Sequence, residues 1–197
     1  MRRLLVLLVI VATAACSPSG GESESATSEG ANTSTTTVAE TTMTTTSAHF
    51  EVSSPAFADG GVVPVEFTCD GSDVNPPLDV VGIPEGTESL VIIVDDPDAP
   101  MGIWDHWVEF DIATGPGSFQ IPKDTPPLGV QGVNSWNLEG YMGPCPPAGD
   151  DPHAYHFTIH ALDGTLGLPG GVDSAAVRSA MDGKVIESVE LVATFGR

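Results

Sequence analysis

The stretch Asp95-Asp96-Pro97-Asp98-Ala99-Pro100 decides the fold of this chain, and it follows an apolar run from Leu90 to Val94. Its two prolines fix φ and push the residues before them toward extended geometry, so the segment is a stiff turn. Asp96 and Asp98 lie two residues apart on it, so their carboxylates can project in the same sense. Aspartates in loops often only cap turns, which is the alternative interpretation of this pair.

Three further segments carry groups that can share a pocket with this turn. His106-Trp107 follows closely, and Gly143-Pro144-Cys145-Pro146-Pro147 and His153-Ala154-Tyr155 lie much further along the chain. Two nearby carboxylates repel, so we expect a raised pKa at one aspartate or a neutralising cation, for which protonated His106 is the obvious candidate. Imidazole and backbone N–H groups can bind a phosphate while a carboxylate receives an ammonium, so the set suits a zwitterionic ligand.

The order of these segments resembles that of the phosphatidylethanolamine-binding proteins, and more narrowly their bacterial branch of Raf kinase inhibitor-like proteins. The resemblance covers about Phe50 to Arg197 and implies a β-sandwich with a small anion-accepting pocket at one end. Ala154 stands where the family usually has an arginine, which weakens the implication that phosphate binds tightly. The ligand-binding residues that the resemblance implies are Asp96, Asp98, His106, Gly143, Pro144, Pro146, His153 and Tyr155.

The chain after residue 48 has the pattern of β-structure. Side chains in the segment from Tyr155 to Ala161 alternate between apolar and polar, which predicts a strand with one buried face and with His156 and His160 on the other. Clusters of Gly, Pro, Asp and Asn separate short apolar runs, as in a sandwich or barrel. The predicted strands are residues 62–67, 90–94, 107–112, 155–162 and 187–195.

A short helix is predicted over residues 174–181, with Ser174 as its N-cap and Gly183 near its end. Together with the strands, it predicts an all-β fold with one or two short helices near the C-terminus, and the family resemblance implies that this fold is mainly an antiparallel sandwich of the phosphatidylethanolamine-binding type. Residues 49–197 are the length of one ordinary domain with a single core.

The first 16 residues have the features of a lipoprotein signal peptide. A positive start precedes an apolar run from Leu4 to Val11, which is much shorter than the roughly 20 apolar residues of a membrane-spanning helix. Small residues precede Cys16, as in a lipobox, so we expect lipidation of this thiol and a protein tethered to the membrane outside the cytoplasm. The alternative is cleavage at an Ala-x-Ala-like site, which gives a secreted protein. Residues 17–48 are rich in Ser, Thr and Gly and predict a disordered tether.

The net charge narrows the range of binding partners. The formal net charge of −21 at pH 7 disfavours binding to nucleic acid or to anionic lipid headgroups, so we expect membrane contact through the lipid anchor only.

If Cys16 is lipidated, Cys69 and Cys145 remain as an even pair in an oxidising compartment. A disulfide between them and two buried free thiols are both open interpretations, and their spacing carries no zinc signature.

No catalytic motif stands out in the sequence. It contains no Gly-x-Ser-x-Gly elbow, no glycine-rich phosphate loop ending in Lys-Ser/Thr and no His-Glu-x-x-His pattern. We therefore predict a non-enzymatic binding protein for a small phosphorylated or zwitterionic ligand, without cofactor or metal, with modulation of an unidentified protein partner as a further expected role. Two alternatives are a hydrolase whose metal is held by Asp96, Asp98, His106 and His153, and an extracytoplasmic protease inhibitor.

Overall fold

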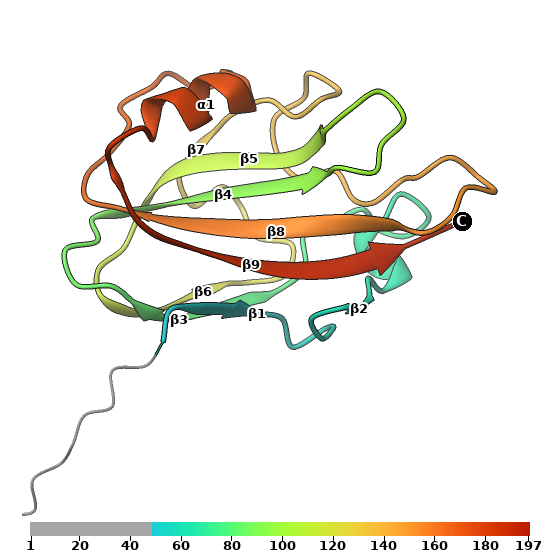
Figure 1. Ribbon diagram of the computed structural model, residues 1–197, viewed down its shortest axis with the longest axis horizontal. Helices are drawn as coiled ribbons and strands as arrows, with labels where there is room; N and C mark the ends of the chain where they lie inside the picture. Colours follow the sequence, from blue (N-terminus) through green and yellow to red (C-terminus); the bar gives the residue numbers. More distant parts are fainter. Residues whose placement is uncertain (1–48) are drawn as a thin grey trace, which may run out of the picture. The chain divides into compact units, whose positions relative to one another are not determined.

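The computed structural model describes residues 49–197, which form two β-sheets packed face to face (Figure 1). The smaller sheet contains β1 (Glu51–Ser53), β3 (Leu78–Ile83) and β6 (Gly117–Ile121), in the order β1-β3-β6. The larger sheet contains β2 (Gly61–Val62), β4 (Ser89–Asp96), β5 (Trp104–Ala113), β7 (Val130–Gln131), β8 (His153–Leu162) and β9 (Val185–Phe195). Its order is β2-β9-β8-β4-β5-β7, and only the β2–β9 pair is parallel.

Two helical segments complete the described elements: the 3-10 helix η1 (Val65–Phe67) and the helix α1 (Ser174–Ala180). The predicted all-β sandwich with a short helix near the C-terminus is therefore confirmed. Neither segment has the length and apolar character needed to cross a membrane. The predictions of a signal peptide, of lipidation at Cys16 and of a tether fall on residues 1–48, outside the described residues.

The main core lies between the two sheets, and the alternation along β8 shows how the sequence builds it. Tyr155, Phe157 and Ile159 face this core, whereas His156 and His160 lie on the opposite face, as predicted. A second apolar cluster lies where α1 packs on the outer face of the larger sheet. Both faces of β4 are therefore covered, which explains why Leu90–Val94 is an unbroken apolar run.

Two local predictions were wrong. Residues 62–67 are not one strand, because Pro64 has no N–H to extend the pairing and the chain turns into η1. The N-cap of α1 is Asp173, whose side chain accepts a 2.9 Å hydrogen bond from the Ala176 N–H, and not Ser174. Ser174 instead donates its hydroxyl to the Asp105 carboxylate.

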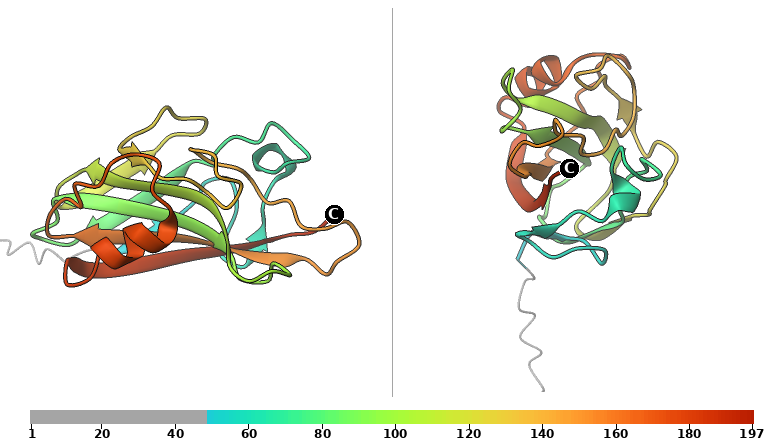
Figure 2. Two further views of the ribbon diagram at one scale, coloured as in Figure 1. Left: turned by 90° about the horizontal axis from the view of Figure 1, so that it is seen from above. Right: turned by 90° about the vertical axis from the view of Figure 1, so that its right-hand side faces the viewer.

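The strand order places the sequence-predicted site segments together at one end of the larger sheet. β5 and β8 flank β4 and run antiparallel to it, so β4 ends where its neighbours begin. The β4–β5 turn, the segment before β8 and η1 lie at this same end in different views (Figure 1 and Figure 2). Asp96, His106 and His153 are thus brought near one another by topology, although they are far apart in the sequence.

Candidate ligand-binding pocket

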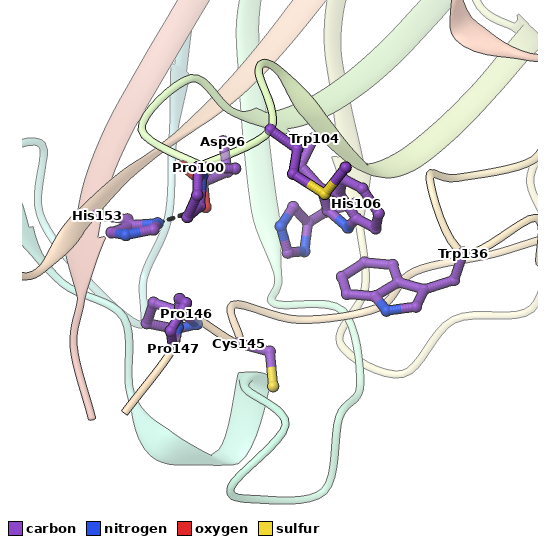
Figure 3. A pocket seen from close by; sticks show the side chains of 11 residues that line it. Asp96, Pro100, Trp104, His106, Trp136, Cys145, Pro146, Pro147 and His153 are labelled. Carbon is purple, nitrogen blue, oxygen red and sulfur yellow. Dashed lines mark hydrogen bonds and ion pairs between the residues drawn. The ribbon is translucent and has the colours of Figure 1, made fainter. Parts of the chain in front are cut away.

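A cavity of about 350 Å³ lies at this end of the sandwich (Figure 3). Its polar lining comes from Asp96 at the end of β4, His106 near the start of β5 and His153 at the start of β8. All three side chains are buried, so their protonation states and hydrogen bonds decide what the cavity can accept.

Asp96 is paired with His153. The two atoms Asp96 Oδ2 and His153 Nδ1 are 2.8 Å apart, and both side chains are almost completely shielded from solvent. The other carboxylate oxygen of Asp96 accepts a 2.9 Å hydrogen bond from the Asp98 backbone N–H. The sequence suggested His106 as the cation beside Asp96 and Asp98, but the structure places His153 next to Asp96, because β8 begins beside the end of β4.

His106 is oriented by its backbone contacts. Its Nδ1 atom lies 2.7 Å from the Met142 carbonyl oxygen and 3.1 Å from that of Gly143, so Nδ1 carries a proton and donates it. Burial lowers the pKa of His106, and the nearby carbonyls and carboxylates offset this only in part. At neutral pH the ring is therefore uncharged, and Nε2 makes no hydrogen bond within residues 49–197.

Tyr155 lies behind the cavity and does not line it. Its ring contacts His106 edge-to-face at 5.2 Å between centroids, and its hydroxyl has no hydrogen-bond partner among the described residues. Burial, followed by the negative charge of Asp96, raises the pKa of Tyr155 well above its ordinary value. The phenol therefore stays protonated and supports the His106 ring from the core side.

An aromatic wall faces the polar groups. Trp104 and Trp136 meet edge-to-face with centroids 5.3 Å apart, and Trp136 also contacts the His106 ring at 5.0 Å. Sequence reasoning missed both tryptophans, although Trp104 lies only two residues before His106. Trp136 lies on a separate loop, and no spacing in the sequence indicates that this loop returns to the cavity.

The third wall is the proline-rich segment, and a disulfide holds it in place. Cys145 lines the cavity and is bonded to Cys69, which resolves the two open interpretations of these cysteines in favour of the bridge. The Pro146 carbonyl accepts a 2.8 Å hydrogen bond from Arg197 Nε. At Gly143, a Cβ atom would come within 2.2 Å of the Phe67 carbonyl oxygen, so only glycine fits this close approach.

Behind the cavity, Arg178 on α1 neutralises two aspartates. Asp95 and Asp105 are directly opposite each other on β4 and β5, and each side chain is 16% exposed. Arg178 Nη2 lies 2.6 Å from Asp95 Oδ2 and 3.7 Å from Asp105 Oδ1. Because Asp96 and His106 are their chain neighbours, this cluster fixes the two strand ends that carry the site.

We expect Arg178→Met to lower the free energy of unfolding at pH 7 by roughly 1–2 kcal/mol, because two partly buried carboxylates then face each other without a counter-charge. Urea unfolding measures the loss. A second change, Asp95→Asn, should recover part of it by removing the repulsion. Strictly additive losses in the double variant would contradict this role of Arg178.

The family of the chain follows from comparison with known proteins. The family model described as phosphatidylethanolamine-binding protein matches residues 53–196. The chain belongs to the phosphatidylethanolamine-binding protein family. The UPF0098 protein PH1269 from Pyrococcus horikoshii is 43% identical to this chain over 152 residues, which cover 73% of this chain and 75% of that protein.

Two further similar proteins extend the comparison. The Mycobacterium tuberculosis protein named "Putative lipoprotein LppC" is 38% identical over 189 residues, which cover 96% of this chain and 92% of that protein. The crystal structure of YbcL from E. coli, described as a member of the mammalian PEBP family, has 30% sequence identity and a TM-score of 0.70. The match covers 76% of this chain and 99% of the YbcL chain.

The structure distributes the site residues implied by the family resemblance over two layers. Asp96, His106, Pro146 and His153 line the cavity. Asp98 is exposed, and its carboxylate accepts a 2.9 Å hydrogen bond from the backbone N–H of Ala154. The remaining implied residues, Gly143, Pro144 and Tyr155, lie outside the lining and shape it from behind.

Within residues 49–197, no three His, Cys, Asp or Glu side chains are arranged to hold a metal ion. The hydrolase alternative needs Asp96, Asp98, His106 and His153 to converge. Asp98 instead points at the backbone of β8, because its oxygen caps the Ala154 N–H. No observation in this part of the chain therefore favours the hydrolase over the binding protein.

Proposed function

We propose that this family member is an extracytoplasmic, lipid-anchored binding protein that holds a small phosphorylated or zwitterionic molecule in the cavity. The observation that carries the proposal is the set of three buried polar side chains, Asp96, His106 and His153, around one cavity. Anchoring through Cys16 is supported by the sequence before it and by the lipoprotein name of the Mycobacterium tuberculosis relative.

His106 is the anion-responsive group in this proposal. Its Nδ1 proton is committed to backbone carbonyls, so a second proton on Nε2 makes the ring a charged donor toward a bound phosphate. Asp96 then offers its remaining acceptor capacity to an ammonium group. A bound anion favours the charged imidazole, so binding raises the pKa of His106, which burial lowers in the free protein.

We expect phosphoethanolamine to bind more tightly as the pH falls. The direction of this pH dependence follows because the ligand binds the protonated form of His106 more tightly. The affinity is highest below the pKa of His106 in the free protein, and it falls as the pH rises through the higher pKa of His106 in the complex. His106→Asn should reduce the affinity at pH 5.5 by about 10- to 100-fold, the worth of one charge-assisted hydrogen bond. Calorimetry from pH 5.5 to 8 measures both effects.

Asp98→Asn is the matched control, because it changes a carboxylate of the same turn that lies outside the cavity. We expect its affinity to stay within about twofold of the wild type, whereas Asp96→Asn should lose the pairing with His153 and bind weakly. Failure of the wild-type protein to bind either phosphate or phosphoethanolamine across this pH range would overturn the proposed function.

A further inference from the structure

The aromatic wall forms a second, separate part of the cavity. Figure 3 shows the rings of Trp104 and Trp136 on the side away from His153, with His106 between the two regions. Trp136 remains 37% exposed, so part of its surface is available to a ligand. The cavity therefore has a polar region around Asp96 and His153 and an aromatic region around the two indoles.

The loop that carries Trp136 is held in one conformation by its own hydrogen bonds. Asn134 Oδ1 accepts from the N–H groups of Trp136 at 3.0 Å and Leu138 at 3.2 Å. Ser135 is bonded twice to Asp105, through its N–H at 2.9 Å and through its hydroxyl oxygen at 2.8 Å. These bonds fix the backbone at Trp136, and edge-to-face contacts with Trp104 and His106 orient its indole, so the ring is positioned in advance at a lower entropy cost of binding.

Electrostatics favour a cation in the aromatic region. The lining contains the Asp96 carboxylate and no lysine or arginine, and the chain as a whole carries a formal net charge of −21. The face of an indole ring is the negative end of its quadrupole and attracts cations. Anionic or neutral groups have no comparable electrostatic attraction to the faces of these rings.

We propose that Trp104 and Trp136 form a subsite for the methylated ammonium group of a zwitterionic ligand, an inference that rests on the proposed function. Within the described part of the chain, the lining of the aromatic region holds no carboxylate, since Asp96 lies in the polar region beside His153. A primary ammonium needs acceptors for its three N–H groups, whereas a methylated ammonium needs none and is bound by aromatic faces. The subsite therefore favours the methylated group.

Four probes separate charge from size: phosphate, phosphoethanolamine, phosphocholine and 3,3-dimethylbutyl phosphate, which has the shape of phosphocholine without its positive charge. We expect phosphocholine to bind about tenfold more tightly than phosphate and than the neutral analogue, as measured by calorimetry. We expect phosphoethanolamine to lie between phosphate and phosphocholine.

Trp136→Leu should lower the affinity for phosphocholine about tenfold and leave that for phosphate within about twofold. Leu138→Ala is the matched control on the same loop, since Leu138 is exposed and does not line the cavity. It should leave both affinities unchanged. Trp136→Phe keeps an aromatic face and should retain part of the preference for phosphocholine.

Each outcome distinguishes the subsite from the proposed function. Equal binding of phosphate, phosphocholine and the neutral analogue would overturn the subsite and leave the proposed function standing. Binding of tetramethylammonium that is lost in Trp136→Leu, without any phosphate binding, would support the subsite and overturn the phosphate part of the proposed function. Absence of binding to all of these probes would overturn both.

Discussion

Replacing Cys69 and Cys145 together with serine is expected to lower the free energy of unfolding by about 4 kcal/mol. The bridge joins residues 76 positions apart, so it removes much of the conformational freedom of the unfolded chain. It also ties the proline-rich wall to the segment after η1. The double variant avoids a lone thiol, and urea unfolding of the oxidised wild type and the variant measures the difference.

A reductant separates the effect of the bridge from that of the substitutions. Reduced wild-type protein should unfold at nearly the same urea concentration as the double variant, and the variant should not respond to reductant. Cys145 also lines the cavity, so the variant should bind phosphoethanolamine more weakly. Identical unfolding midpoints for oxidised and reduced wild type would show that the bridge adds no stability.

The four long strands of the larger sheet, β4, β5, β8 and β9, could be predicted from the sequence because they carry a strong pattern, whereas the two-residue strands β2 and β7 could not. The alternation from Tyr155 to Ala161 fixes which face of β8 is buried, and the unbroken apolar run in β4 reflects a strand covered on both sides. The smaller sheet gave no comparable pattern. Its strands are short, and a register shift after Val81 interrupts the alternation of β3.

The site was predicted as a set of segments but not as a set of contacts. Asp96, His106 and His153 do meet, because antiparallel order brings the end of β4 to the starts of β5 and β8. Which histidine pairs with Asp96 depends on side-chain direction, which the sequence does not contain. Trp136 could not be found at all, since its position depends on hydrogen bonds between its loop and Asp105.

Acid should destabilise this protein through His160, by roughly 3 kcal/mol between pH 6.5 and pH 4. Burial, followed by the positive charge of Arg178, lowers the pKa of His160 from 6.5 to about 4. Between pH 6.5 and pH 4, His160 binds a proton in the unfolded chain but not in the folded protein, so the free energy of unfolding falls as the pH decreases. One pKa unit corresponds to about 1.4 kcal/mol, and the loss levels off below pH 4, where the folded protein also binds the proton.

The variant His160→Gln cannot titrate and should flatten this part of the pH dependence, measured as the free energy of unfolding in urea at several pH values. Ser188→Ala is the matched control, because it removes the hydroxyl 2.7 Å from His160 Nδ1 but keeps the imidazole. Its stability should still fall with acid. Because His106 is also buried with a lowered pKa, a residual slope should persist in His160→Gln. A slope in that variant equal to that of the wild type would assign the acid sensitivity to other groups.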